Sequence, residues 1–241
     1  MKRFAALTFL GLSSLAWGHV RQRVYVPTSG TSGDGKESII AWPLSSGVKV
    51  SMHQFSGNIG SGSTVTAIDF TAARAAVGAG LAQWTGNGVT LFGGLTLSLP
   101  VDLDGTLPYA TTNNCERSSS SSVDGVNNVL FTSKIDTSCA SSLSSSTGVI
   151  GLTRVLYDST TGQIVEADVQ FDDKEFLFKT SGSNDISVTP KEVLLSDVVT
   201  HELGHFFGLD HTSSRSSTML FAIAEDLHTT KTDDQLGLFS L

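Results

Sequence analysis

The sequence predicts one α+β domain, because a helix-like pattern and strand-like patterns follow one another along the same chain. Apolar residues recur at spacings of three and four over residues 70–84, which predicts a helix. Apolar and polar residues alternate over residues 48–52 and 163–171, which predicts half-buried strands. The chain has 241 residues, of which 39% are hydrophobic, and this suffices for a single well-packed core.

The first helix should bury one face against the rest of the domain. That face is formed by Phe70, Ala73, Val77, Leu81 and Trp84. Gly78 and Gly80 each lower the helical preference of the segment by about 1 kcal/mol relative to alanine. Close packing against a sheet is one reason for a helix to tolerate such glycines.

Further strands are expected over residues 88–98 and 126–132. The clearest hairpin joins strands over residues 149–157 and 163–171 through the polar segment 158–162. Serine-, threonine- and asparagine-rich segments should be surface loops, namely residues 111–123 and 136–148.

A second helix should begin between Pro190 and Asp197. Two caps are possible there, the capping-box pattern of residues 189–192 and Ser196. The helix should end at Gly208, since glycine is favoured just beyond a helix C-terminus.

A third helix is expected at the end of the chain, over residues 233–241. Thr232 and Gln235 have the spacing of a capping box at its start.

The first eighteen residues are typical of a cleavable secretory signal. Lys2 and Arg3 precede an apolar stretch, and Ala16-Trp17-Gly18 resembles a small-residue cleavage site. The alternative is an uncleaved anchor or a buried first helix. Residues 19–46 then form a leader or a short pro-segment, and the folded domain is expected over residues 47–241.

Cys115 and Cys139 flank a serine-rich stretch, and export would expose both to an oxidising compartment. A disulfide between them is therefore expected, and it would contribute roughly 3 kcal/mol in the loop-entropy model. Two free buried thiols are the alternative.

The chain is acidic, with a formal charge of −8 that becomes −10 once Lys2 and Arg3 are removed. Such a surface repels nucleic acid and anionic membranes. The apolar stretch near the N-terminus is too short to span a bilayer. We expect a secreted, extracellular or periplasmic monomer without stable membrane insertion.

A metal-site motif lies in the second expected helix. In the segment HELGH, His201 and His205 are four residues apart and share one helical face, so both imidazoles can reach one ion. Gly208 would let the chain turn back and bring His211 to the same ion. Three protein ligands with one open position are typical of catalytic zinc rather than structural zinc.

Glu202 lies beside the first histidine and is the expected catalytic residue. Zinc lowers the pKa of a bound water to about 7 and polarises a carbonyl, and Glu202 would take the proton of that water and pass it to the leaving amine. Peptide hydrolysis suits this arrangement. A bare HExxH can occur by chance as an exposed polar stripe, but the full pattern through His211 is far more specific.

The segment HELGHFFGLDHT resembles the zinc-binding signature of the metzincins, and Thr212 after the third histidine resembles the matrixin branch. The resemblance implies a twisted, mostly parallel sheet with an antiparallel edge strand, two long helices, and a small lower subdomain with a Met-turn and a C-terminal helix. Met219 in Ser217-Thr218-Met219 would be the Met-turn methionine, an apolar floor beneath the zinc.

The segment from Ala167 to Glu175 resembles the matrixin segment that binds structural zinc and calcium. Gln170 stands where the family has a zinc-binding histidine, so one catalytic zinc is expected and no second zinc site. Asp172 and Glu175 match calcium-binding positions, with a solvated acidic turn as the alternative.

The resemblance implies a secreted zinc endopeptidase acting on proteins or peptides. Two alternatives stay open: a zinc-binding protein of the same fold without general proteolysis, and a hydrolase acting on a non-peptide amide or on one dedicated partner. No Pro-Arg-Cys-Gly segment is present, so control by a cysteine switch is not expected. Leu220 to Ile223 would form a wall of the substrate pocket.

Overall fold

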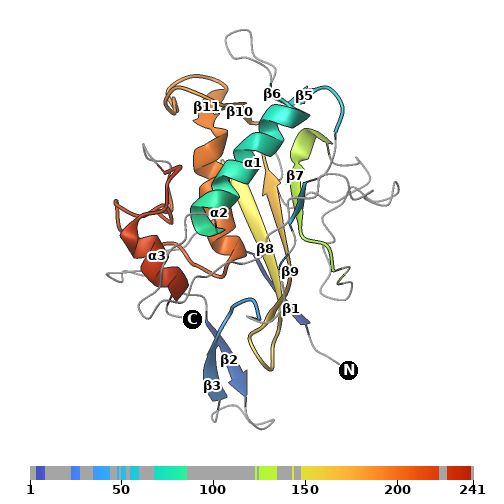
Figure 1. Cartoon of the computed structure of the whole chain (residues 1–241), viewed down its shortest axis with the longest axis vertical. Coiled ribbons are helices and arrows are strands. Elements are labelled where there is room, and N and C mark those ends of the chain that lie inside the picture. The colour runs from blue at the N-terminus through green and yellow to red at the C-terminus, as the bar shows by residue number, and fades with distance from the viewer. Residues whose placement is uncertain are drawn as a thin grey trace.

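A mixed five-stranded sheet forms the centre of the computed structural model (Figure 1). The structure describes residues 4–8, 23–27, 35–43, 48, 50–52, 55–59, 68–85, 123, 125–134, 143, 148–222 and 227–239. The strand order is β1 (Phe4–Thr8), β8 (Gly151–Asp158), β9 (Ile164–Phe171), β7 (Asn128–Phe131) and β4 (Ser51–Met52). β9, β7 and β4 run parallel, whereas β8 is antiparallel to both of its neighbours.

The sheet confirms the α+β expectation and adds one feature to it. β8 is not the edge strand of the described sheet, because β1 pairs with it from Arg154 to Asp158. β1 lies inside the expected signal segment of residues 1–18. Within the described part of the chain, no helix is long and apolar enough to cross a membrane.

The β8–β9 hairpin forms where the sequence predicts it. Thr153 pairs with Val169 and Val155 pairs with Ala167, so the register places apolar side chains of both strands on the helix-covered face. The polar residues of β9 alternate with these apolar side chains, and they are buried as well, so the strand is not half-buried as predicted. Glu166 accepts a hydrogen bond from the backbone N–H of Gly125 and Asp168 accepts one from that of Asn128, at 2.8 and 2.9 Å.

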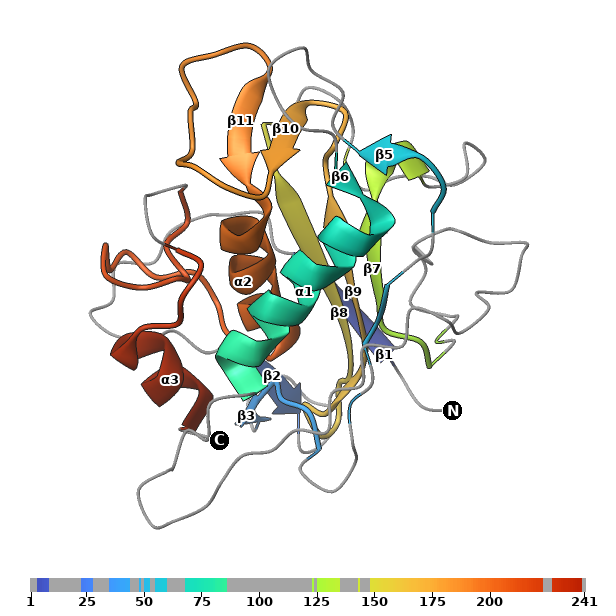
Figure 2. The ribbon, with the colours of Figure 1, turned by 45° about the horizontal axis from the view of Figure 1, so that its top comes forward.

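Two helices cover one face of the sheet (Figure 2). α1 (Phe70–Thr85) confirms the first expected helix, and it buries Ala73, Val77, Leu81 and Trp84. α2 (Leu195–Phe206) packs against α1 and against strands β8 and β9. The indole of Trp84 in α1 donates a hydrogen bond of 2.9 Å to the carbonyl oxygen of Thr200 in α2, which locks the two helices together.

α2 begins at Leu195, within the expected range from Pro190 to Asp197, but its start is not capped as expected. Lys191–Leu194 forms strand β11, which pairs in parallel with β10 (Phe176–Lys179), and neither strand was expected. The N-cap residue of α2 is Leu194, which has no side-chain cap bond. Both expected caps, residues 189–192 and Ser196, are therefore wrong. The start of α2 is fixed instead by the backbone pairing of β11 with β10. It is also fixed by a hydrogen bond of 2.6 Å from the N–H of Leu194 to Asn184 Oδ1.

The remaining elements are short. They are the antiparallel pair β2 (Arg23–Pro27) and β3 (Gly35–Ile39), the pair β5 (Asn58–Ile59) and β6 (Ile68–Asp69), a 3-10 turn (Thr132–Lys134), and α3 (Thr232–Phe239). α3 confirms the third expected helix. The expected strand over residues 88–98 and the expected disulfide of Cys115 and Cys139 lie outside the described residues.

Candidate metal centre

α2 and the turn that follows it bring three histidines together. Nε2 of His211 lies 3.1 Å from Nε2 of His201 and 3.1 Å from Nε2 of His205. The ligand atoms of these three residues all lie within 4.8 Å of one another, and among the described residues they form the one such cluster of metal-binding side chains. The expected ligand set is therefore assembled in space.

Gly208 makes this assembly possible by ending α2 in a left-handed turn. Its φ is +92°, and a Cβ at this position would lie 2.3 Å from the carbonyl oxygen of Ile40. The N–H of Gly208 bonds to the carbonyl of His205 at 2.8 Å, and the N–H of Leu209 bonds to that of Gly204 at 3.0 Å, as in a Schellman motif. The chain thus reverses and returns His211 to the face of α2 that carries the other histidines.

Backbone carbonyls orient two of the imidazoles. Nδ1 of His201 lies 2.7 Å from the carbonyl oxygen of Thr218, and Nδ1 of His205 lies 2.8 Å from that of Leu209. Since a carbonyl only accepts, each Nδ1 must carry the proton, and each Nε2 presents its lone pair to the cluster. Lone pairs about 3 Å apart repel one another unless a cation lies between them.

The cluster fits zinc. Tetrahedral zinc with Zn–N bonds of about 2.0–2.1 Å separates its nitrogen ligands by about 3.3 Å. The measured separations of 3.1 Å are close to that value. Neutral imidazole is the ligand form, and burial favours it here: burial lowers the pKa of His201 to about 4 and lowers the pKa values of His205 and His211. Zinc would bind without displacing protons at neutral pH.

The segment beneath the cluster is held by a buried carboxylate. Met219 is 3% exposed and packs against Gly204, where a Cβ would lie 2.1 Å from its Sδ. Asp234 in α3 accepts hydrogen bonds from the hydroxyl of Ser217 and, at 2.9 Å, from the N–H of Thr218. Because the Thr218 carbonyl orients His201, Asp234 supports the metal centre through the turn.

Glu202 is buried next to the histidines, on the side of α2 that faces β8. Burial raises the pKa of its carboxyl to about 7, which a hydrogen bond from Thr153 opposes. The Thr153 hydroxyl lies 2.6 Å from Oε2 of Glu202 and 3.0 Å from its backbone carbonyl. A carboxyl group with a pKa near neutrality can both accept and release a proton at physiological pH.

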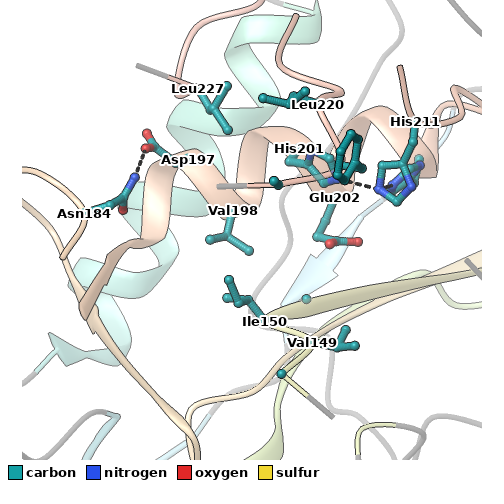
Figure 3. A pocket seen from close by; sticks show the side chains of 15 residues that line it. Val149, Ile150, Asn184, Asp197, Val198, His201, Glu202, His211, Leu220 and Leu227 are labelled. Atoms are coloured by element: carbon teal, nitrogen blue, oxygen red, sulfur yellow. Dashed lines mark hydrogen bonds between the residues drawn. The ribbon is translucent and has the colours of Figure 1, made fainter. Parts of the chain in front are cut away.

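A cavity of about 200 Å³ opens beside the cluster (Figure 3). The segment 148–151 before and at the start of β8 forms one side, and α2 forms another. Leu220, Phe221 and Ala222 line it as well, which agrees with the expected wall after the Met-turn, while Ile223 lies outside the described residues. The cavity leads from the three histidines to Asn184 and Asp197.

The expected calcium ligands are engaged in a local turn. Asp172 is buried, and its Oδ1 accepts the N–H groups of Lys174 and Glu175 at 3.1 and 3.2 Å. The neighbouring Asp173 accepts the N–H of Ser133 at 2.7 Å. Neither Asp172 nor Glu175 belongs to a cluster of three metal-binding side chains in the described part of the chain. The geometry at Asp172 and Glu175 therefore does not support calcium binding there.

Four residues of the site were missed by the sequence reasoning. Thr153 lies 49 positions from Glu202 and bonds to it, and it carries no motif of its own. Asn184, Asp197 and His228 form a polar group around the far end of the cavity. The one available signal was Asp197, an acidic residue four positions before His201 within a mostly apolar stretch.

The matrixin family model matches residues 144–241. The matched stretch contains the β8–β9 hairpin, α2, all three histidines, Met219 and α3. No curated protein sequence gives a significant match to this chain. The match supports a matrixin-like metzincin catalytic domain over residues 144–241, and the matrixins are a family of zinc-binding metallopeptidases.

Proposed function

We propose that this protein is a secreted, zinc-dependent endopeptidase that hydrolyses peptide bonds in proteins through Glu202. One observation supports this best: a buried carboxylate with a pKa near 7 adjoins three convergent histidines, and all four residues line one cavity. A purely structural metal site has four protein ligands and no need for a general base.

His201, His205 and His211 would hold the zinc. When bound there, zinc would polarise the scissile carbonyl and acidify a water molecule. Glu202 would accept a proton at its carboxylate and deliver it to the leaving amine nitrogen. Thr153 would hold Oε2 of Glu202 in place, so that the other oxygen, Oε1, is available to the reacting groups.

A polypeptide substrate suits the surroundings of the cluster. In the described sheet, β1 pairs with β8 only from Arg154 to Asp158. The part of β8 closest to the histidines, Gly151–Thr153, pairs only with β9. An extended peptide could therefore add to this edge by backbone hydrogen bonds, with one side chain in the cavity.

Export and processing complete the proposal. Residues 1–18 would direct secretion and be removed, residues 19–46 would be a leader or short pro-segment, and residues 47–241 would be the catalytic domain. Cys115 and Cys139 would pair after export, and the mature protein would be a monomer. N-terminal sequencing of the exported protein tests the first point, and a retained Met1 would contradict it.

Cleavage of denatured casein and a mixed peptide library by the purified mature protein tests the activity. The expected result is cutting that a chelator abolishes and that zinc restores, with about one zinc per chain by metal analysis. Glu202→Ala should keep the zinc and lose the cutting. Bound zinc with no cutting under any condition would point instead to a binding protein of the same fold.

A further inference from the structure

The end of the cavity farthest from His211 carries a buried negative charge (Figure 3). The side chain of Asp197 is 3% exposed. Its Oδ2 accepts a hydrogen bond of 2.8 Å from Nδ2 of Asn184, and its Oδ1 lies 3.2 Å from Nδ1 of His228. Asp197 precedes His201 by one helical turn, a distance of about 6 Å along the axis of α2.

The walls between the two ends of the cavity are apolar. They are formed by Val149, Ile150, Val198, Leu220 and Leu227. Among the described residues that line the cavity, none is lysine or arginine. The described cavity lining therefore contains no lysine or arginine that could pair with the Asp197 carboxylate.

This combination matches one kind of side chain. Lysine and arginine bury an aliphatic stem along apolar surface and place a cationic head at its tip. A carboxylate offers about four acceptor positions, and the contacts to Asn184 and His228 use one on each oxygen. The Asp197 carboxylate can thus accept a further, charge-assisted hydrogen bond. The acidic net charge of −8 would also attract basic peptides to the protein.

We propose that the cavity binds a lysine or arginine side chain next to the scissile bond, and that Asp197 determines this specificity. The inference rests on the proposed function and names its substrate class: peptides with a basic residue flanking the cut. An apolar side chain of similar length would leave the buried carboxylate facing hydrocarbon, which is unfavourable.

The first test compares peptides that differ only in charge. A substrate found in the library is resynthesised with arginine or its neutral isostere citrulline at each position flanking the cut, beside leucine. We expect kcat/KM for arginine at one of these positions to exceed that for citrulline by about tenfold or more, as for a hydrogen bond to a charged group. Equal rates for arginine and citrulline, or the highest rate for leucine, would overturn the inference.

The second test uses a matched pair of variants. Asp197→Asn keeps the shape of the side chain and removes its charge, whereas Asp185→Asn removes one charge beside Asn184, in the loop before β11 and outside the cavity lining. The arginine-to-citrulline ratio should fall to within about twofold of unity in Asp197→Asn and stay unchanged in Asp185→Asn. An unchanged ratio in a folded, zinc-loaded Asp197→Asn protein would contradict the role of Asp197. If that variant does not fold, the wild-type ratio decides.

A binding measurement separates this inference from the proposed function. The arginine and citrulline peptides are titrated by calorimetry into the Glu202→Ala protein, in which no turnover is expected. Binding of the arginine peptide at least about tenfold more tightly supports the basic specificity, even if the wild-type protein were to cut nothing. Equal affinities would overturn the specificity, even if the wild-type protein cuts other peptides.

Discussion

The two long helices lie side by side, yet their buried faces are built from different chemistry. α1 presents Val77, Leu81 and Trp84 to the core, and its polar contact to α2 is the indole hydrogen bond to Thr200. α2 buries apolar residues toward α1, but toward β8 and the cavity it buries Asp197, Glu202 and His205. Burial of the apolar face of α1 stabilises the fold. Burial of the polar groups of α2 lowers the stability of the fold, because these groups lose their hydration.

This difference has a physical origin in the partners of each polar group. The polar groups of α2 are hydrogen-bonded to backbone carbonyls and side chains from β8, the Met-turn and the loop before β11. Such hydrogen bonds orient a polar group, but their free energy seldom equals the cost of removing that group from water. Variants on the two helices should therefore change different properties.

The largest expected effect is on catalysis by Glu202→Gln, which should lower kcat by about 10²- to 10⁴-fold while zinc stays bound. The metal-free variant should also be more stable than the metal-free wild type. The pKa of Glu202 is about 7 in the folded protein and 4.5 in the unfolded chain. Above pH 4.5 the unfolded chain therefore loses this proton more readily, and ionisation of Glu202 opposes folding. Urea unfolding at pH 8 should show a gain of up to about 3 kcal/mol. The gain should vanish below pH 4.5, and a gain that persists there would contradict its electrostatic origin.

Acid should destabilise the metal-free protein through its histidines. The folded pKa of His201 lies near 4, below its ordinary value of 6.5, so the unfolded chain binds the proton first as the pH falls. Stability should decline from pH 6.5 to pH 4, by about 3 kcal/mol from His201 and by a further amount from His205 and His211. The Glu202→Gln background is the one to measure, because Glu202 has the opposite effect between pH 4.5 and 7. A flat profile in that background would contradict burial of neutral imidazoles.

On α1, Gly80→Ala should cost stability without altering the chemistry. A Cβ at Gly80 would lie 2.5 Å from Cγ1 of Val199, a buried and branched side chain with little room to move. Overpacking of this kind costs about 1–3 kcal/mol, which the better helical preference of alanine offsets by about 1 kcal/mol. Gly78→Ala, at a half-buried position of the same helix, is the control and should gain stability. A folded Gly80→Ala protein with reduced kcat would show that the two helices are not separable in this way.

The smallest expected effect belongs to Thr153, which touches the chemistry only through Glu202. Thr153→Val removes the hydroxyl at Oε2 and should lower kcat by about tenfold, with KM little changed. Thr153→Ser keeps a hydroxyl and should restore most of the rate. Equal losses in both variants would mean that packing at β8, rather than the hydrogen bond, accounts for the effect.

Local sequence patterns predicted a large part of the fold and of the candidate site. The spacing of Phe70 to Trp84 predicted α1, the alternation in residues 163–171 predicted β9, and Gly208 marked the end of α2. The histidine cluster was predictable for the same reason. Its three ligands lie within eleven residues, so helical geometry and one glycine turn suffice to bring them together.

Other features depend on residues far apart in the chain, where no local pattern signals the contact. The start of α2 at Leu195 falls within the predicted range, but its caps were misassigned, because pairing of β11 with β10, rather than a capping side chain, fixes this helix end. The sequence by itself determined the candidate metal ligands, the place of Glu202 beside them and the main helices, since these follow from short-range periodicity. Only the tertiary structure decided that Thr153 holds Glu202 and that Asp197 lies at the end of the cavity, because those relations arise when separate elements pack against α2.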